Sequence, residues 1–502
     1  MVKSQYHIGN ITILLPIWYF RRISVFCFLY YNIHNLYEGV KAIKNQEVKP
    51  NIVLIVTDQM RSDCLGAAGN PVIETPYLDT LAVQGAMFNN AYTAVPSCIA
   101  ARAALMTGLS QKSHGRLGYQ DRVTWDYRHY LAGELALAGY HTHCVGKMHV
   151  HPSRSLCGFH DIQLHDGYLH NYRSMGVAAG ENQFICDDYI NWLREHKGAN
   201  ADIIDTGPEC NSRVARPWIY EEHLHPTNWV VTRSIDFLRR KDPSKPFFLT
   251  MSFVRPHSPI DPPKYYFDMY QNEDVPMPLM GDWADRDDFE RDGMLYNCMR
   301  GIARDKDIKK ARAAYYGCIT HIDHQIGRFL QALFDHDAQE NTVIIFTSDH
   351  GDLLGDHNLY RKSLPYRGSA SIPLIISDRG DITGMKKNAS IIQVVELRDI
   401  MPTILDIADA AVPDAVEGKS MLPLLKGEQC AWREYIHGEH ALGNMSNHYI
   451  ACEKDKYIWF PVTGLEQYFN LEKDPDELKN LIGDENCQSR IEYLKNALTQ
   501  EL

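Results

Sequence analysis

The sequence contains no uninterrupted run of the roughly 20 apolar residues that a membrane-spanning helix needs. Two shorter apolar runs lie near the amino terminus, at 11–20 and 23–33, and Arg21-Arg22 separates them. A charge pair between apolar blocks, with no small-residue cleavage site after it, is also unlike a simple signal peptide. We expect no integral membrane span and treat residues 1–47 as a non-catalytic extension: a degenerate export signal, a peripheral anchor or translated sequence upstream of the true start. An export signal would place the protein in the periplasm or outside the cell, and its absence would place it in the cytoplasm.

Close cysteine pairs and basic stripes are also missing. The 12 cysteines include no C-x-x-C pair, which argues against a zinc ribbon or a disulfide scaffold in a chain of 502 residues. The net charge of −12, without a basic stripe that carries aromatics, argues against nucleic-acid binding. An acidic protein can still bind an anion where the binding site itself is cationic.

Four short apolar runs each end in a polar cluster. They are 51–56 before Thr57-Asp58-Gln59, 141–145 before Gly146-Lys147-Met148-His149, 247–253 before Arg255-Pro256-His257, and 342–347 before Ser348-Asp349-His350-Gly351-Asp352. Runs of this kind are typical of buried parallel strands, and ligands of open α/β sheets bind beyond the carboxyl ends of the strands. We therefore expect two carboxylates, an amide, three imidazoles and a lysine to converge on one crevice that holds a cation and an anion together.

Helical patterns alternate with these strands. They lie at 77–86, 130–138, 228–239 (with Thr227 as a candidate cap) and 311–333. This rhythm predicts an α/β fold with a large, mostly parallel sheet between layers of helices. The rhythm is lost over 158–225, where tyrosine, histidine, asparagine and glycine accumulate, and we interpret that segment as binding loops.

The pattern changes again after about residue 425. Short strands are expected at 435–439, 448–452, 456–460 and 466–470, with a closing helix at 490–502. The predicted organisation is therefore an extension (1–47), a catalytic domain (48–425) and a C-terminal α+β subdomain (426–502).

One further segment bears a candidate nucleophile. Pro96-Ser97 is typical of a helix start, with Ser97 able to cap the first turn. Cys98 would then lie where backbone N–H groups favour negative charge, and Arg102 would lie four residues on along the same helix face. A thiol in that setting is poised for reactivity, although a small buried cysteine beside a surface arginine is the alternative.

The run Cys98-Ile99-Ala100-Ala101-Arg102 resembles the Cys-x-(Pro/Ala)-x-Arg motif of the formylglycine-dependent sulfatases, which belong to the alkaline-phosphatase-like superfamily. The run 139–149 (GYHTHCVGKMH) resembles the second signature of that family, and the likeness extends from about 49 to about 484. The run 464–481 (GLEQYFNLEKDPDELKNL) resembles the C-terminal subdomain of the family, which implies a small antiparallel sheet with a packed helix in 426–502. Ala100 stands where proline is usual, and Ile99 where a smaller residue is usual. The resemblance implies that a maturing enzyme oxidises Cys98 to formylglycine (3-oxoalanine), whose hydrated aldehyde is the nucleophile.

The resemblance also implies the roles of the other site residues. One divalent metal would be bound by Asp58, Gln59, Asp349 and His350 together with the modified Cys98. Calcium is expected, and manganese, magnesium and zinc stay open because Gln59 and His350 stand where many members carry Asp and Asn. The catalytic residues would be Cys98, Arg102 on the oxyanion, Lys147 and Lys362 on the sulfate, His149 on the formylglycine hydroxyl and His257 on the leaving group. Arg361 is the neighbouring alternative to Lys362.

We therefore expect a sulfuric ester hydrolase that acts on a sulfate ester of a small molecule or oligosaccharide, and the aromatic-rich segment 158–225 favours a sulfated saccharide. The alternatives are a phosphonate monoester or phosphodiester hydrolase of the same superfamily, or a choline or aryl sulfatase. A catalytically silent glycan-binding module would be favoured if Cys98 stayed unmodified.

Overall fold

The computed structural model describes residues 3–8, 11–16, 49–167, 186–284 and 295–502. The chain separates into two compact units, Met1–Lys49 and Pro50–Leu502. In the first unit, β1 (Lys3–Ile8) and β2 (Ile11–Pro16) pair as an antiparallel hairpin. The apolar run at 23–33 lies outside the described residues. Among the helices of the described ranges, none has the length and hydropathy needed to cross a membrane.

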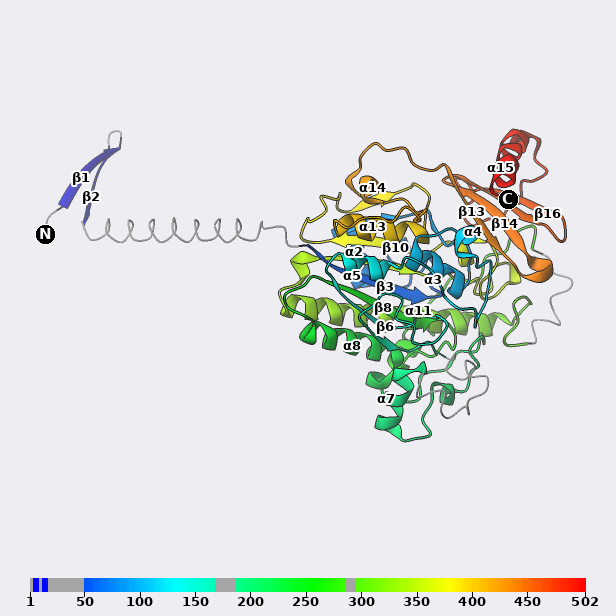
Figure 1. Ribbon diagram of the computed structural model, residues 1–502, viewed down its shortest axis with the longest axis horizontal. Coiled ribbons are helices and arrows are strands. Elements are labelled where there is room, and N and C mark those ends of the chain that lie inside the picture. The colour runs from blue at the N-terminus through cyan, green and yellow to red at the C-terminus, as the bar shows by residue number, and fades with distance from the viewer. Residues whose placement is uncertain (1–2, 9–10, 17–48, 168–185, 285–294) are drawn as a thin grey trace. The chain divides into compact units, whose positions relative to one another are not determined.

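An eight-stranded sheet forms the centre of the second unit, in the order β11-β4-β10-β9-β3-β8-β6-β7 (Figure 1). The five strands from β9 to β7 are parallel to one another, whereas β10 is antiparallel to both of its neighbours. The predicted mostly parallel sheet is confirmed, and the four apolar runs are adjacent strands within it. The strands are β3 (Asn51–Asp58), β4 (Gly85–Phe88), β6 (His141–Gly146), β7 (Asp161–Leu164), β8 (Phe247–Pro256), β9 (Thr342–Ser348), β10 (Leu374–Asp378) and β11 (Ala389–Ile391). A separate two-stranded sheet pairs β5 (Ala91–Tyr92) with β12 (Val395–Glu396).

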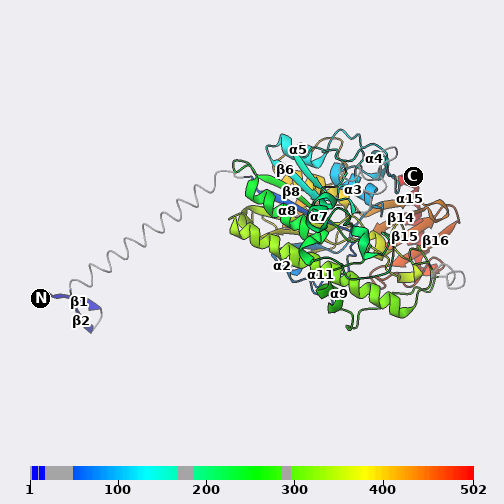
Figure 2. The same ribbon diagram turned by 90° about the horizontal axis from the view of Figure 1, so that it is seen from below.

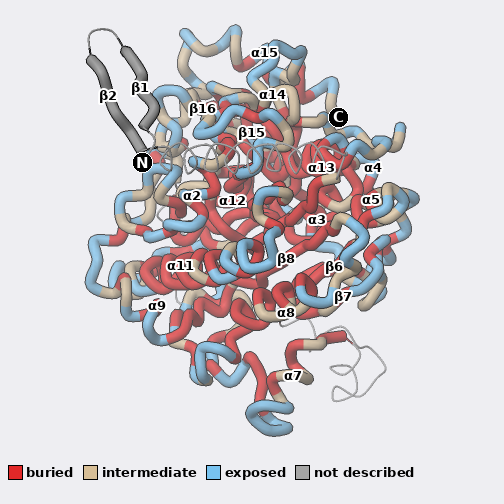
Figure 3. Tube along the Cα trace, turned by 90° about the vertical axis from the view of Figure 1, so that its left-hand side faces the viewer, coloured by how far each residue is buried: buried red, intermediate tan, exposed pale blue. Residues whose placement is uncertain are grey.

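Helices cover both faces of the large sheet (Figures 1 and 2). On β3, Val53 and Ile55 pack in one core with α2, α8 and α11, whereas Leu54 and Val56 pack in a second core with α3, α5 and α13. Because both faces of the strand are buried, its sequence is continuously apolar rather than alternating, and the tube in Figure 3 is red along the central elements. The α-helices are α2 (Pro76–Gln84), α3 (Cys98–Thr107), α4 (Gln111–His114), α5 (Leu131–Leu137), α7 (Asp188–Lys197), α8 (Pro226–Arg240), α9 (Lys264–Met269), α11 (Asp305–Asp335), α12 (Arg367–Ala370), α13 (Ile400–Ile407), α14 (Leu422–Lys426) and α15 (Gln488–Glu501). Short 3-10 helices occur at η2 (Ile203–Thr206), η3 (Glu222–Leu224), η4 (Gln339–Asn341), η5 (Asp356–Asn358), η6 (Leu397–Asp399), η7 (Gly443–Met445) and η8 (Glu485–Cys487).

Two helix predictions were wrong in detail. The helix expected at 77–86 ends at Gln84, and the next residues form β4, which pairs with β10. The helix ends here because the next residues pair with β10. The two backbones are so close at Gly85 that a Cβ on this residue would lie 1.9 Å from the carbonyl oxygen of Ile376. The cap of α8 is His225 rather than Thr227, because Nδ1 of His225 accepts the backbone N–H of Thr227 at 3.2 Å.

The small C-terminal antiparallel sheet is confirmed. It consists of β13 (Tyr435–His440), β14 (Asn447–Cys452), β15 (Asp455–Phe460) and β16 (Leu465–Asn470). Tyr449 and Ile458 on one face pack against residues of the catalytic body, whereas Ile450 and Tyr457 on the other face pack against α15. The domain boundary between 425 and 426 stays a prediction.

Candidate active site

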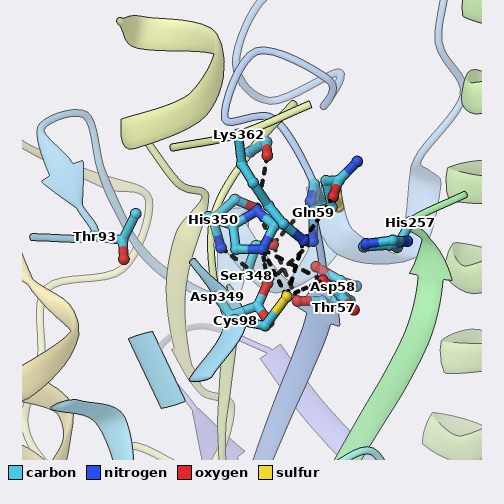
Figure 4. Close-up of polar contacts among 12 residues, drawn as sticks. Thr57, Asp58, Gln59, Thr93, Cys98, His257, Ser348, Asp349, His350 and Lys362 are labelled. Carbon is cyan, nitrogen blue, oxygen red and sulfur yellow. Dashed lines mark hydrogen bonds and ion pairs between the residues drawn. The ribbon is translucent and has the colours of Figure 1, made fainter. Parts of the chain in front are cut away.

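The carboxyl ends of the four central strands meet at one place. Asp58 ends β3, and Asp349 and His350 directly follow β9. Backbone hydrogen bonds join these ends: Asp349 N–H donates to the carbonyl of Thr57 at 3.1 Å, and His257 N–H donates to the carbonyl of Asp58 at 3.0 Å. The ends of the strands therefore fix the positions of Asp58, His257, Asp349 and His350, which Figure 4 shows.

Cys98 is the first residue of α3 and is 2% exposed. Ser97 occupies the N-cap position as predicted, but its side chain makes no capping hydrogen bond. The Cys98 sulfur lies 3.0 Å from Nζ of Lys362 and 3.2 Å from Nε2 of His350 (Figure 4). Oδ1 of Asp58 lies 3.7 Å from the same sulfur.

The charges around this thiol oppose one another. Burial and the Asp58 carboxylate raise the pKa of Cys98. The cations Lys147, Lys362 and His350 outweigh both effects, so the thiol pKa lies below its ordinary value. The site therefore favours a negative charge at position 98.

Four residues at this point could hold a metal ion: Asp58, Cys98, Asp349 and His350, whose ligand atoms all lie within 4.8 Å of one another. Nε2 of His350 is 3.6 Å from Oδ1 of Asp58 and 3.6 Å from Oδ1 of Asp349. Ligands placed about 2.4 Å from one cation at right angles would be about 3.4 Å apart, so this donor set fits a divalent metal.

The hydrogen bonding of His350 also fits metal ligation. Its Nδ1 lies 2.9 Å from the carbonyl oxygen of Gly351, which can only accept a hydrogen bond. Nδ1 therefore carries the proton, and Nε2 faces the cluster. Burial lowers the pKa of His350, but Asp349 raises it, and the resulting pKa lies above its ordinary value. A bound cation would replace the proton on Nε2.

Gln59 lies beside the cluster of candidate metal ligands, and its side chain forms hydrogen bonds with two neighbouring residues. Its Nε2 donates to Asp352 at 2.5 Å, and its Oε1 accepts from Nζ of Lys362 at 3.1 Å. A carbonyl oxygen has two lone pairs, so Oε1 can accept from Lys362 and still ligate a cation. The role of Gln59 as a metal ligand stays a prediction.

Lys147 and Arg102 neutralise the two buried carboxylates. Nζ of Lys147 bonds Oδ2 of Asp58. Burial raises the pKa of Asp58, but Lys147 and the other nearby cations lower it well below its usual value. Nε of Arg102 donates to Asp349 at 3.0 Å. Its Nη1 donates to the carbonyl of Lys147 at 2.8 Å and to Oγ of Ser252 at 2.9 Å.

A cavity of about 410 Å³ opens onto Cys98 and Asp58. Lys147, His149, His257 and Lys362 all line it, so the structure brings these predicted residues together around one space. Lys362 rather than Arg361 has its charged nitrogen within hydrogen-bonding distance of Cys98. The other lining residues are Tyr119, Asp166, Gly167, Glu209, Cys210, Asn211, Val254, Arg255, Ser258 and Arg361.

His257 faces this cavity as a neutral ring. Its Nδ1 lies 2.8 Å from the carbonyl oxygen of Ser258, which fixes the proton on that nitrogen and leaves Nε2 as an acceptor. Burial and the charge of Lys362 hold the pKa of His257 well below its ordinary value. The ring can donate from Nε2 only after it gains a proton, which an anionic ligand would favour.

Four residues around the cavity have left-handed backbone: Gln59 (φ 71°), His149 (φ 59°), Arg361 (φ 67°) and Ser363 (φ 84°). Non-glycine residues in this region carry strain of roughly 1–3 kcal/mol, which clusters at functional sites. Glycine would remove the strain, so its absence indicates that these side chains are needed.

Sequence reasoning missed three supporting residues. Asp166 accepts the backbone N–H groups of Met148 and His149 at 2.8 and 2.9 Å and so shapes the turn after β6. Asp352 orients Gln59, and Ser252 binds Arg102. Asp352 is the last residue of the polar cluster that follows 342–347, where it was given no role, whereas nothing in the sequence around Asp166 or Ser252 marks them.

Eleven of the twelve cysteines lie in the described ranges, and all eleven are free thiols. Only Cys98 among them joins the metal cluster.

Comparisons with known proteins identify the family to which this chain is similar. A family model described as Sulfatase matches residues 50–410, and one described as N-sulphoglucosamine sulphohydrolase, C-terminal, matches residues 355–502. An arylsulfatase of Clostridium perfringens is 60% identical over 455 residues, which cover 91% of this chain and 95% of that protein.

Two solved structures are similar in fold. A phosphonate monoester hydrolase of Agrobacterium radiobacter has a TM-score of 0.74 and 26% identity, over 90% of this chain and 95% of its own. BT4656, in complex with its substrate D-glucosamine-2-N,6-O-disulfate, has a TM-score of 0.71 and 19% identity, over 90% of this chain and 97% of its own. With the matched motifs and the alkaline-phosphatase-like fold, these findings show that the chain belongs to the sulfatase family and is a sulfuric ester hydrolase.

Proposed function

We propose that the protein hydrolyses the sulfate ester of a saccharide, with Cys98 converted to formylglycine as the nucleophile and one calcium ion held beside it. The observation that carries this proposal is the place of the Cys98 sulfur. It lies at a helix N-terminus, within 3.7 Å of Asp58, His350 and Lys362, and at the floor of the cavity.

The metal would be held by Asp58, Asp349, His350 and Gln59, together with the group at position 98. A cation bound there supplies Lewis-acid stabilisation of negative charge on the nucleophile and on the sulfuryl group. The carboxylate-rich donor set favours calcium, and the imidazole leaves manganese and zinc as alternatives.

Lys147 and Lys362 would bind the sulfate. Nζ of Lys362 already contacts the Cys98 sulfur, and Nζ of Lys147 contacts Asp58, which lines the same cavity. Two ammonium groups beside the bound sulfate would neutralise the sulfuryl oxygens as charge shifts onto them.

His257 and His149 would move protons at opposite ends of the reaction. Bound sulfate would favour protonation of His257, whose Nε2 would then donate to the oxygen of the leaving alcohol. His149 lines the same cavity and would accept the proton released when the nucleophile at position 98 is regenerated.

The saccharide assignment has weaker support. BT4656 binds a disulfated glucosamine, but at 19% identity that likeness carries the fold alone. Of the aromatic and histidine-rich segment 158–225, the cavity is lined by Asp166, Gly167, Glu209, Cys210 and Asn211. The tyrosines and histidines at 168–185 lie outside the described residues. In the part of the segment that is described, polar side chains rather than aromatic rings therefore face the cavity.

A phosphonate monoester hydrolase is the second candidate function, because a structural neighbour with that activity has a TM-score of 0.74. The kcat/KM values for an aryl sulfate and for the matched aryl phosphonate, measured on one preparation, distinguish the two. We expect the sulfate to be the better substrate, and a reversed order would support the phosphonate assignment.

The mass of the tryptic peptide 62–102 tests the nucleophile. This peptide contains two cysteines, Cys64 and Cys98. After formylglycine formation, iodoacetamide will label it once and a carbonyl-directed hydrazide will label it at position 98. A peptide from active enzyme that takes two alkyl groups and no hydrazide would exclude the proposed modification.

A further inference from the structure

Glu209 lines the cavity, and one oxygen of its carboxylate has no partner among the described residues. Oε2 is buried and makes no hydrogen bond with any described residue. Oε1 has the weak contact of the Cys210 thiol, at 3.7 Å. A buried carboxylate oxygen without a donor is costly, so a ligand that donates a hydrogen bond to this carboxylate would be favoured.

The segment that carries Glu209 is anchored. The backbone N–H of Arg213 donates to the carbonyl of Tyr296 at 2.9 Å, and its Nη1 donates to the carbonyl of Leu295 at 2.7 Å. Ala215 forms a parallel bridge with Ile260, close in sequence to the loop that holds His257. These contacts hold the chain just beyond Glu209 beside the segment that follows the catalytic loop.

Arg361 presents an opposite charge to the same cavity. Among the residues that the structure describes, its hydrogen bonds are made by the backbone and its side chain takes part in none, nor in an ion pair. Its backbone is left-handed (φ 67°) and is held by a hydrogen bond from its N–H to Oδ1 of Asp352 at 2.9 Å. A strained position that keeps a long cationic side chain indicates a binding role for that side chain.

We propose that Glu209 and Arg361 determine the specificity of the enzyme by binding hydroxyl groups of a sugar ring next to the scissile ester. The proposal rests on the sulfatase function above and names its substrate class. A sugar hydroxyl both donates and accepts hydrogen bonds, so one polyhydroxylated ring can donate to Glu209 and accept from Arg361.

The chemistry of the cavity disfavours the two other alcohols. A quaternary ammonium has no N–H to donate and is usually bound by several aromatic faces. Among the described residues that line the cavity, only Tyr119 is aromatic, and it is 55% exposed. A simple aryl group offers no donor to Glu209 and would leave that carboxylate buried without a partner.

The test uses full-length, matured enzyme and three variants: Glu209→Gln, Arg361→Gln and their combination. The substrates are 4-nitrophenyl sulfate, choline sulfate and a panel of monosulfated hexoses, with deoxy analogues of the best hexose. Glutamine keeps the shape of Glu209 and removes its charge. We expect kcat/KM for the best hexose to fall about ten- to a hundredfold in each single variant, and by a larger factor than kcat/KM for 4-nitrophenyl sulfate.

Glu195→Gln and Arg128→Gln are the matched controls, because both residues are exposed and lie outside the cavity. The deoxy analogue that lacks the hydroxyl bound by Glu209 should lose activity with the wild-type enzyme and show little further loss with Glu209→Gln. Equal losses for hexose and aryl substrates in both variants would overturn the specificity role while leaving the sulfatase function intact. Efficient turnover of choline sulfate with none of any hexose would also overturn it. If the matured enzyme cleaved none of these sulfate esters, the proposed function itself would be wrong.

Discussion

Nε of Arg102 donates to Oδ2 of Asp349 at 3.0 Å, so this arginine holds a candidate metal ligand in place. Both side chains are buried, and Nη1 of the same guanidinium also binds the Lys147 carbonyl and Ser252. Arg102 therefore joins the residues that follow β9 and β6, and Ser252 within β8, to the helix that begins at Cys98. Its contacts are those of a positioning residue for the metal site.

Replacing Arg102 with lysine should weaken metal binding. Lysine keeps the charge but loses the fixed geometry of the guanidinium, so Asp349 would be oriented less well. Loss of such a supporting contact typically lowers metal affinity by about 10–100-fold. Calorimetric titration of metal-free protein with calcium measures this change. Arg128→Lys, at an exposed position, is the control, and an unchanged Kd for the Arg102→Lys protein would contradict the assignment.

Cys98→Ala should abolish sulfate ester hydrolysis while the protein stays folded. Alanine fits at the start of α3, and the lost thiol contacts are polar contacts with Lys362 and His350. Without a nucleophile, the residual rate should be at least about a thousandfold below that of the wild type. Circular dichroism and thermal unfolding provide the fold control. Turnover near the wild-type rate would show that position 98 does not carry the nucleophile.

The sequence predicts the strand-end geometry because that geometry depends on local patterns. Asp58, Lys147, His257 and Asp349 each follow a buried strand, and adjacent parallel strands bring their carboxyl ends together. Their convergence could therefore be inferred before any contact was known. The short strands of the C-terminal subdomain were predictable from the same kind of pattern, whereas their arrangement as an antiparallel sheet was implied by the family resemblance.

Features that depend on long-range contacts could not be predicted in this way. The segment at Gly85 continues a helical pattern, yet it becomes a strand because β10 lies beside it in the reverse direction. The partner of Arg102 is 247 residues away, and the carboxylate that binds the Gln59 amide is 293 residues away. Nothing near Glu209 in the sequence shows that its carboxylate faces the cavity.

Removal of the metal should lower the stability as well as the activity. A ligand that binds only the folded state stabilises it by about 2.7 kcal/mol at a concentration a hundredfold above its Kd. We expect Tm to fall on treatment with a chelator and to return with added calcium. In Asp349→Ala, which lacks a carboxylate of the cluster, calcium should no longer raise Tm. A calcium-dependent rise in Tm as large as that of the wild type would exclude Asp349 as a ligand.

Acid should destabilise the protein through buried neutral histidines near α4 and β13. Burial lowers the pKa of His114 to about 4 and that of His437 to about 3. In the unfolded chain these histidines have ordinary pKa values near 6.5, so they bind protons at pH values where the folded protein does not. The stabilising effect is thus complete above about pH 6.5 and is lost as the pH falls toward 4. Besides burial, the positive charges of Lys112 and Arg398 oppose protonation of His437, and its Nδ1 lies 3.2 Å from the side-chain amide nitrogen of Gln111.

Urea unfolding at several pH values between 7 and 4.5 measures this dependence. His437→Asn should show a smaller loss of unfolding free energy over that range than the wild type does. His336→Asn, in a residue that the structure leaves exposed, serves as the control. Identical pH profiles for the wild type and His437→Asn would show that His437 does not contribute.

His257→Ala should reduce turnover in a way that depends on the leaving group. The proposed proton donor assists departure of a basic alcohol, whereas an activated phenolate leaves without a proton. For an alkyl or sugar sulfate we expect a loss of about a hundredfold or more in kcat/KM, within the range of a general acid. For 4-nitrophenyl sulfate the loss should be much smaller. The measurement is kcat/KM for a series of substituted phenyl sulfates, plotted as its logarithm against the pKa of the leaving phenol. The slope should be steeper for His257→Ala than for the wild type, because the variant must expel the leaving group unprotonated. Equal slopes for the two enzymes would assign His257 to binding rather than to proton transfer.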